Sequence, residues 1–388
     1  MNVCILSDTK VWGGAEVHTV GLAGALAGRG HDVSIVALGD DVFRDRLNGC
    51  RTSVAVRKPA LPRPMHRMGF RECAALVRGL PGDVGVMVRW GLEAGSLALD
   101  VAARLRFGRT IAIEHSSAEM APRTSRRLFG LIPGLGVWWY RMWLTWRFRS
   151  MASSRVVAVS ETARERLIHD FRLPRRKVVA VRNGIDADRY RRDDAARAAV
   201  RRSWGASDST VVVGSVSRLS PEKGLDSSVA AFARLTRLRP ERDVRLVLVG
   251  EGDERKTLEK AAREAGVLDR VVFPGFTDRP WDAHSGIDVY LQPSREEAIG
   301  LAMMEAMACE CYPIATAVGG VPEVLSAPGV GRLTAPGDVD ELMAALDEAT
   351  GLDPERRREI GRAARRHIVE RFNAAVQFEA LARVIERG

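Results

Sequence analysis

The chain has 388 residues, of which 46% are hydrophobic and 28% are charged, and it carries a formal net charge of +10. This length exceeds what one hydrophobic core usually supports, so we expect two domains, and the composition excludes the disordered and fibrous classes. The amino terminus has no basic segment and no long apolar run, which predicts neither a signal peptide nor a spanning helix and favours the cytoplasm. The five cysteines are scattered without zinc-site spacing and are expected to be reduced thiols.

The first half of the chain alternates short apolar runs with longer amphipathic segments. Strands are predicted at residues 3–7, 33–38, 84–88, 110–113, 156–159 and 178–181, with a helix at 15–27. The spacers are long enough for helical crossovers, which favours a parallel sheet. Residues 183–209 are rich in Arg, Asp and Ala and contain no apolar strand, so we predict a linker there.

The second half repeats this alternation. Strands are predicted at residues 211–216, 246–249, 271–273 and 289–291, helices at 225–238 and 254–265, and charged helices from residue 338 onward. The predicted fold class is therefore α/β, with two Rossmann-like, doubly wound parallel-sheet domains facing across a cleft. Ligands of such sheets usually bind beyond the carboxyl ends of the strands.

The stretch of residues 294–323, SREEAIGLAMMEAMACECYPIATAVGGVPE, follows one of these strands and carries two carboxylates. Glu297 lies in the predicted loop, and Glu305 lies in a helix that begins near Gly300. Helix N–H groups bind phosphate, while carboxylates bind hydroxyls and repel phosphate. The combination therefore predicts a ligand with both parts, such as a nucleotide sugar.

Other loops at predicted strand ends also carry polar groups. Arg218 and Lys223, in SRLSPEKGLD, could neutralise two phosphates, or they could be an ordinary solvated basic loop. His115 ends the strand TIAIEH and is as compatible with a structural as with a functional histidine. Gly14, after the first strand, would admit a ligand to the backbone, although such turns often need glycine for structure.

Two short polar motifs have simple structural interpretations. Ser160 is predicted to cap the helix that starts at Glu161. Asp186 and Asp188 form a DxD pattern that could bind a metal diphosphate. We interpret it as a turn, because Arg218 and Lys223 already offer neutralisation of a diphosphate, and we predict no metal site.

Taken in order, these segments resemble the family-four retaining glycosyltransferases, which have the GT-B fold. The resemblance covers nearly the whole chain and rests on GGAEVHTVGLAGALAGRGHDV, VVAVSETARERL, VRNGIDADRY, GSVSRLSPEKGLD, LVLVGEGDERKTLE, VVFPGF and EEAIGLAMMEAMA. It implies a first domain at residues 1–185, joined by the C-terminal helix 372–388, and a donor-binding domain at residues 186–371. The chain departs from the family pattern at Ile299, where an aromatic residue is usual, and at Glu310, where a glycine is common.

The resemblance also implies roles for individual residues. Arg218 and Lys223 would hold the donor diphosphate, Glu305 the ribose hydroxyls and Glu297 the transferred sugar. The remaining donor-binding positions would be the backbone around Gly14, Gly300 and Leu301, His115 facing the sugar, and Gly275 and Phe276 near the base. The catalytic group would comprise His115, Arg218, Lys223 and Glu297, without a metal or other cofactor.

A cluster of tryptophans and arginines stands apart from these motifs. From residue 121 to residue 160 there are seven arginines and no acidic residue. Interfacial helices combine aromatic and basic residues in this way, so we predict docking on an anionic membrane surface, on its inner face. A helix packed on its own domain or on a partner subunit is the alternative. Nucleic acid is not expected, because no known binding module accompanies the cluster. The membrane-facing candidates are Trp138, Trp139, Arg141, Trp143, Trp146 and Arg147.

The predicted function is transfer of a hexosyl group from a nucleotide-diphosphate sugar to an acceptor hydroxyl. UDP is favoured as the nucleotide, with GDP as second choice, and the acceptor is expected to be a lipid-linked or cell-envelope glycan. Two alternatives remain open: a nucleotide-sugar epimerase of the same architecture, and a non-catalytic subunit that binds sugar nucleotides.

Overall fold

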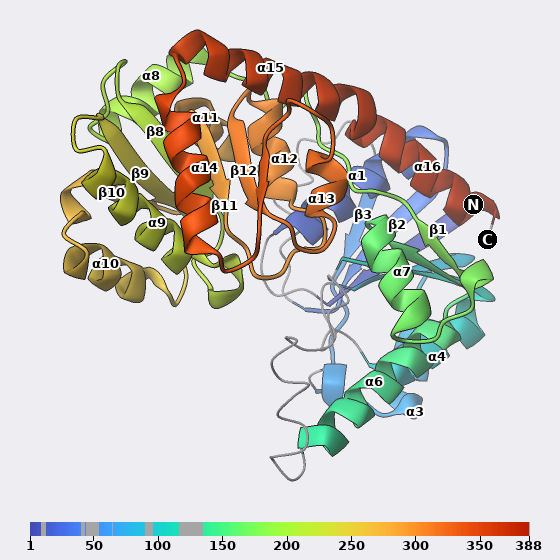
Figure 1. The fold of residues 1–388 in the computed structure, drawn as a ribbon. Helices are drawn as coiled ribbons and strands as arrows, with labels where there is room; N and C mark the ends of the chain where they lie inside the picture. Colours follow the sequence, from blue (N-terminus) through green and yellow to red (C-terminus); the bar gives the residue numbers. More distant parts are fainter. Residues whose placement is uncertain are drawn as a thin grey trace. The chain divides into compact units, whose positions relative to one another are not determined.

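The computed structural model describes residues 1–8, 13–39, 43, 54–63, 65–89, 96–115 and 135–387, without the side chains of residues 66 and 135–142. The chain divides into two compact units (Figure 1), Met1–Asn183 with Ala375–Gly388, and Gly184–Ala374. The sequence predicted a boundary after residue 185 and a return to the first domain from residue 372. In the structure, the chain passes from the first unit to the second after Asn183 and returns to the first unit after Ala374.

The first unit contains a seven-stranded sheet in the order β3-β2-β1-β4-β5-β6-β7, with every neighbouring pair parallel. Its strands are β1 (Asn2–Ser7), β2 (Asp32–Ala37), β3 (Val54–Arg57), β4 (Val84–Arg89), β5 (Arg109–Glu114), β6 (Arg155–Ala158) and β7 (Val178–Ala180). Its described helices are α1 (Gly14–Gly28), α3 (Phe70–Arg78), α4 (Leu97–Phe107), α6 (Leu135–Ala152), α7 (Glu161–His169) and α16 (Ala374–Arg387), with short turns η1 (Met65–Arg67) and η2 (Arg175–Lys177).

The second unit contains a six-stranded parallel sheet in the order β10-β9-β8-β11-β12-β13. Its strands are β8 (Val211–Val216), β9 (Val244–Val249), β10 (Val271–Gly275), β11 (Val289–Gln292), β12 (Tyr312–Thr316) and β13 (Arg332–Thr334). Its helices are α8 (Asp194–Ser203), α9 (Leu225–Leu238), α10 (Arg255–Glu264), α11 (Pro280–Gly286), α12 (Leu301–Ala308), α13 (Val321–Leu325), α14 (Val339–Gly351) and α15 (Pro354–Arg371), with turns η3 (Pro221–Lys223) and η4 (Leu268–Arg270).

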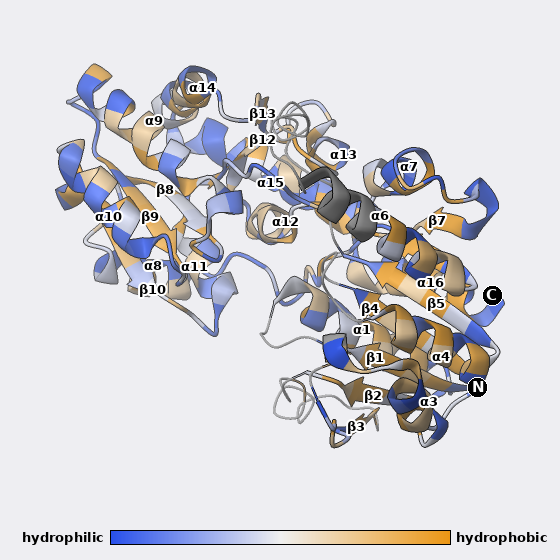
Figure 2. Cartoon of the chain, turned by 90° about the horizontal axis from the view of Figure 1, so that it is seen from below, coloured by the Kyte–Doolittle hydropathy of each residue, from blue (hydrophilic) through white to orange (hydrophobic). Residues whose placement is uncertain are grey.

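Apolar side chains cover both faces of the second sheet, as expected for parallel strands between two helical layers. One core joins alternate strand residues such as Val212 and Tyr290 to α12 and α15, and the other joins Val213 and Leu291 to α9 and α14. In Figure 2 the strands β8 and β9 are mainly orange, whereas α10 is mainly blue, since only its inner face packs on the sheet. The two predicted Rossmann-like parallel-sheet domains are therefore confirmed.

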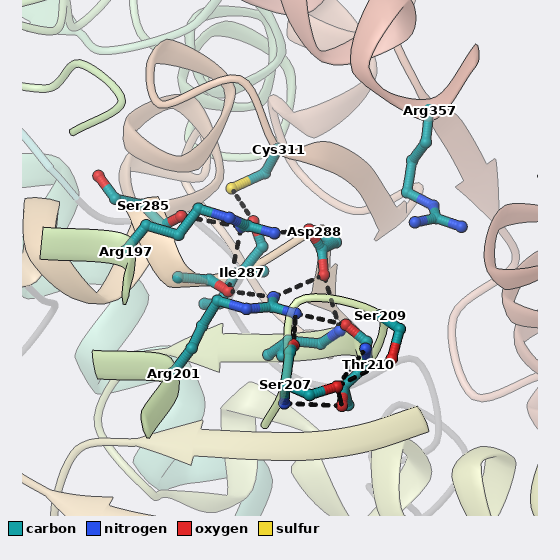
Figure 3. A network of polar contacts seen from close by, with 12 residues as sticks. Arg197, Arg201, Ser207, Ser209, Thr210, Ser285, Ile287, Asp288, Cys311 and Arg357 are labelled. Atoms are coloured by element: carbon teal, nitrogen blue, oxygen red, sulfur yellow. Dashed lines mark hydrogen bonds and ion pairs between the residues drawn. The ribbon is translucent and has the colours of Figure 1, made fainter. Parts of the chain in front are cut away.

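The predicted linker at residues 183–209 is wrong, because part of it forms α8, an integral helix of the second unit. Arg197 and Arg201 reach from α8 to Asp288 (Figure 3), with nitrogen–oxygen distances of 2.6 and 2.9 Å. Arg201 also donates to the carbonyl of Ser207 at 2.6 Å. The charge of this segment suggested an exposed linker. Arg197 and Arg201 instead pair with Asp288, which directly precedes β11.

The C-terminal helix α16 packs on the first unit (Figure 1). The Phe378 ring lies so close to α1 that a Cβ at Gly21 would come within 2.4 Å of it, so Gly21 is required for this packing. Arg29 pairs with Glu379 and Glu386 at 2.7 and 2.8 Å. These pairs are partly exposed, so each contributes little to stability.

Candidate functional site

The strand order of the second sheet places its topological switch point between β8 and β11. The chain leaves β8 toward β9 and β10, and then returns to place β11 on the other side of β8. Open parallel sheets bind ligands at such a point, beyond the carboxyl ends of the strands. The loop after β8 carries Arg218 and Lys223, and the loop after β11 carries Glu297.

Lys223 and Glu297 meet at this switch point. The Lys223 Nζ lies 2.6 Å from Glu297 Oε1, and the Ser294 hydroxyl donates to the same oxygen at 3.1 Å. Their side chains are 24% and 13% exposed, so both are half-buried and still reachable from solvent. The pair therefore holds a cation and a carboxylate ready at one position, where each can exchange its partner for a ligand group.

The backbones of the two loops are in close contact. Gly224 has a φ of +62°, and a Cβ there would lie 2.2 Å from the carbonyl oxygen of Pro293. Arg295 N–H donates to the carbonyl of Glu222 at 2.8 Å. Gly300, with φ +85°, then turns the chain into α12, whose first residue is Leu301. The first N–H groups of α12 thus follow directly on the Glu297 loop, and such groups bind anions.

Four further candidates belong to the second unit. Glu305 lies in α12 with its side chain 18% exposed. Gly275 ends β10, and Phe276 follows it with 67% of its surface exposed. Arg218 is exposed, and its charge affects the pKa of Glu222. Burial raises the pKa of Glu222, but a hydrogen bond from Ser220 and the charges of Arg218 and Lys223 together have the larger effect. The pKa of Glu222 is therefore lowered.

Gly14 and His115 belong to the first unit and form a separate group. Gly14 is the first residue of α1, and His115 directly follows β5. The ring of His18, one turn into α1, meets the His115 ring edge-on with centroids 4.7 Å apart. Burial lowers the pKa of His115 to about 4, and burial together with His115 lowers the pKa of His18. Both rings are therefore neutral at pH 7.

Sequence reasoning missed four residues that contact these candidates: Ser294, which donates to Glu297, His18, which contacts His115, and Tyr190 and His284, which lie against Glu305. Position offers a signal for two of them, since His18 lies one turn after Gly14 and Ser294 begins the Glu297 loop. For Tyr190 and His284 the sequence gives no comparable signal.

The turns have the geometry expected from their sequences. The Ser160 hydroxyl accepts the N–H of Ala163 at 3.1 Å, so the predicted cap of α7 is confirmed. Asp186 Oδ1 accepts the N–H groups of Asp188 and Arg189, both at 3.1 Å, as in an Asx turn. Within the described ranges, no group of three His, Cys, Asp or Glu side chains is placed to hold a metal ion.

The aromatic and basic helix α6 is partly a core element. Trp146 is buried and packs on Phe171 with ring centroids 4.0 Å apart, so its prediction as a membrane-facing residue is wrong. Trp143 donates its Nε1–H to the carbonyl of Asp170 at 2.8 Å, and Arg147 lies over the Trp143 ring. The side chains of Trp138, Trp139 and Arg141 lie outside the described residues. None of the described helices is long and apolar enough to span a membrane.

Comparison with known proteins identifies relatives for both units. The family model "Glycosyltransferase Family 4" matches residues 12–189, and "Glycosyl transferases group 1" matches residues 196–367. The N-acetyl-alpha-D-glucosaminyl L-malate synthase of Bacillus anthracis is 32% identical over 230 residues, which are 59% of this chain and 58% of that protein. A GDP-mannose-dependent alpha-(1-6)-phosphatidylinositol monomannoside mannosyltransferase of Mycolicibacterium smegmatis is 33% identical, over 52% of this chain and 54% of that protein. The chain thus spans little more than half the length of these relatives.

Solved structures agree in fold over the whole chain. HepE of Anabaena, in complex with UDP-glucose, matches with a TM-score of 0.80 and 21% identity, covering 100% of both chains. WaaG, a glycosyltransferase involved in lipopolysaccharide biosynthesis, matches with a TM-score of 0.75 and 17% identity, again over 100% of both chains. With both units matched by models of one enzyme group, the chain belongs to the family-four, group 1 glycosyltransferases of GT-B fold.

Proposed function

We propose that the protein transfers a hexosyl group from a nucleotide-diphosphate sugar to an acceptor hydroxyl. The observation that carries this proposal is the 2.6 Å contact between Lys223 Nζ and Glu297 Oε1 at the switch point of the second sheet. A diphosphate needs a cation at this position, and a sugar needs, beside that cation, a group that accepts hydrogen bonds from its hydroxyls. This one pair supplies both groups.

In the proposed complex, Lys223 and Arg218 bind the diphosphate, and the first N–H groups of α12 lie against it. Glu297, with Ser294 as a second partner, accepts a hydroxyl of the sugar. When the C1–O bond to the diphosphate breaks, negative charge develops on the leaving phosphate. Preorganised cations stabilise that charge more strongly than water does, which is where Lys223 lowers the barrier.

The proposed transfer retains the anomeric configuration and needs no metal. The new bond forms between C1 and the acceptor oxygen, and the acceptor proton passes to the leaving phosphate oxygen. Arg218 and Lys223 neutralise this phosphate in place of a metal ion. His115 of the first unit, held neutral by burial, is kept in this proposal as a catalytic residue.

The donor and acceptor classes follow from chemistry and from the relatives. UDP is our first choice of nucleotide and GDP the second, since the similar structure of HepE contains UDP-glucose and the mycobacterial relative is named for GDP-mannose. That relative is also named for a phosphatidylinositol monomannoside, which supports a lipid-linked acceptor for this protein. We place the reaction at the inner face of the membrane, with α6 as the docking region.

The test begins with thermal stabilisation by a panel of UDP, GDP, ADP and CDP. We expect one nucleotide to raise the melting temperature, and the matching sugar donors then to be consumed, with an acceptor, in the presence of EDTA. Analysis of the product anomer by NMR reports on retention. Release of free sugar and nucleotide without an acceptor would indicate the epimerase. Binding without turnover would indicate the non-catalytic subunit, and no binding at all would refute the site.

Membrane docking needs a separate experiment. Flotation with vesicles that contain an anionic phospholipid should recover the protein at low salt and lose it at high salt, because the attraction is screened. Vesicles of neutral phospholipid are the control. Failure to float with anionic vesicles at low salt would remove the membrane from the proposal and leave the transferase unaffected.

A further inference from the structure

The second half of α6 turns apolar side chains outward and polar side chains inward. Phe148 and Met151 are 53% and 41% exposed, whereas Arg149 and Ser150 are buried. At roughly 100° per residue, Phe148 and Met151 lie on one side of the helix with the half-buried Leu144 between them, and Arg149 and Ser150 lie on the other side. A surface helix of a globular protein normally has the reverse arrangement. The apolar row of Leu144, Phe148 and Met151 therefore faces the surroundings of the first unit.

Buried contacts on the inner side of α6 fix this orientation. Arg149 Nε lies 2.5 Å from Asp100 Oδ2, and the Arg149 carbonyl accepts from the Arg89 guanidinium at 3.2 Å. Trp146 is buried on the same side, and α4, which carries Asp100, packs alongside α6 (Figure 1). Turning Phe148 inward would separate the buried ion pair at a large desolvation cost. The fold itself thus keeps the apolar row outside.

Cations gather at the carboxyl end of the apolar row. Helix α6 contains three arginines and no acidic residue, and Lys177 of η2 donates to the carbonyl of Met151. Burial and the charges of Arg104 and Arg176 lower the pKa of Lys177, so like charges are crowded here. On the neighbouring α7, Glu165 is already paired with arginines. The surroundings of the apolar row therefore suit a negatively charged partner.

We propose that Leu144, Phe148 and Met151 dock the first unit on a membrane surface that contains anionic phospholipids. The apolar row enters the lipid, and the adjoining cations face the headgroups. This inference rests on the proposed function only for the membrane as the place of the reaction, and it assigns docking to the side of α6 opposite to Trp146. A second copy of the chain suits this side less, because a twofold interface would bring the same cations together.

The test is partition of the protein onto vesicles of phosphatidylcholine and phosphatidylglycerol at low salt, measured by sedimentation. Phe148→Ser should reduce the partition coefficient about tenfold, and Phe148→Glu about 30-fold or more, because an apolar side chain no longer enters the lipid. The matched control is Val376→Glu, at a position of α16 that is 62% exposed, and it should bind within about twofold of wild type.

The role of the cations is tested at Lys177. Lys177→Gln should reduce partition about fivefold on vesicles with phosphatidylglycerol, because one cation near an anionic surface is lost. On vesicles of phosphatidylcholine alone, Lys177→Gln and wild type should bind equally weakly. Equal binding of the two proteins to the anionic vesicles would overturn the part of the inference that concerns the headgroups.

Three outcomes would overturn the inference as a whole: wild type that does not bind the anionic vesicles, Phe148→Glu that binds as tightly as Val376→Glu, and a dimeric wild type that Phe148→Glu converts to a monomer. The last result, measured by analytical ultracentrifugation, would assign the apolar row to a second copy.

Nucleotide binding separates this inference from the function on which it rests. Phe148 is exposed and lies in the first unit, so Phe148→Glu should keep the wild-type melting temperature and the wild-type stabilisation by nucleotide. If wild type binds vesicles through Phe148 but no nucleotide stabilises it, the inference stands and the proposed function fails. If a nucleotide stabilises wild type but the vesicles do not bind it, the inference fails and the transferase stands.

Discussion

The carboxyl ends of the two sheets carry similar charged residues in opposite settings. In the first unit, Arg89 and Glu114 are the last residues of β4 and β5, and they join Asp100 and Arg149 in a fully buried cluster with distances of 2.5 to 3.0 Å. In the second unit, Lys223 and Glu297 follow β8 and β11 and remain half-buried.

The difference separates structural charge from functional charge. The first cluster holds two cations and two carboxylates in contact. Burial opposes the charged form of Arg89, but Asp100 and Glu114 outweigh it and raise the pKa of Arg89. Buried ions of this kind cannot exchange partners without a large desolvation penalty. The Lys223–Glu297 pair is accessible enough to trade its contact for a ligand, which is what a binding site requires.

The largest expected effect comes from breaking the buried cluster. Arg89→Met leaves Asp100 and Glu114 with one cation between them, and we expect the free energy of unfolding to fall by about 3–5 kcal/mol. Chemical denaturation followed by circular dichroism measures this. The control is Asp340→Ala, which removes an exposed partner of Arg234 and should cost less than about 0.5 kcal/mol. A loss below about 1 kcal/mol for Arg89→Met would erase the distinction between the two settings.

Breaking the half-buried pair should affect turnover rather than stability. Lys223→Ala removes the cation proposed for the leaving diphosphate, and we expect turnover to fall about 100-fold to 1,000-fold, with the free energy of unfolding changed by less than about 1 kcal/mol. Lys260→Ala, an exposed lysine that pairs with Glu264 on α10, is the matched control and should retain full activity. Steady-state kinetics and denaturation of the same preparations provide both numbers. Normal turnover in Lys223→Ala would contradict the site.

A smaller effect is expected at the histidine pair of the first unit, and it depends on pH. Burial lowers the pKa of His115 to about 4 in the folded state, whereas the pKa of a histidine in the unfolded chain is about 6.5. Between these two pH values the unfolded chain therefore binds more protons than the folded protein. Stability is therefore complete above about pH 6.5 and is lost as pH falls through this window.

The test compares unfolding at pH 7.5 and pH 5. His115→Asn should reduce the pH-dependent loss of stability by about 2 kcal/mol relative to wild type. His169→Asn, at an exposed histidine of the same unit, should keep the wild-type profile. If His115→Asn and wild type lose the same free energy between the two pH values, the buried histidine is not the source of the effect.

The parts of the fold that the sequence predicted are those with continuous apolar runs. The central strands read as strands because both their faces are buried. The edge strand β3 has a half-exposed pattern, β12 contains Pro313, and β13 has three residues, so none gives a clear signal. Arg197 and Arg201 made α8 look like a linker, since a sequence does not show that a distant Asp288 will pair with them.

The same reasoning explains the site. Lys223 and Glu297 could be predicted together because both follow strands of one parallel sheet, and such strands end at a common edge. Tyr190 and His284 could not, because aromatic and histidine side chains in apolar surroundings look like ordinary core. Trp146 shows the opposite error. Its place in a row of aromatic residues predicted a surface that faces the membrane, but its side chain packs in the core.

The smallest expected effect concerns Glu310, a charged residue that belongs neither to the buried Arg89 cluster nor to the Lys223–Glu297 pair. Glu310 follows α12 with a φ of +65°, a left-handed conformation that favours glycine, and the resembled family commonly has glycine there. Glu310→Gly should relieve this strain, and after the greater entropy of glycine in the unfolded chain is subtracted, the free energy of unfolding should rise by at most about 1 kcal/mol. Glu310→Ala removes the same charge and keeps the strain, so it should give no gain. Denaturation of the two variants side by side decides the cause: equal gains would mean that the charge of Glu310, and not its conformation, is unfavourable.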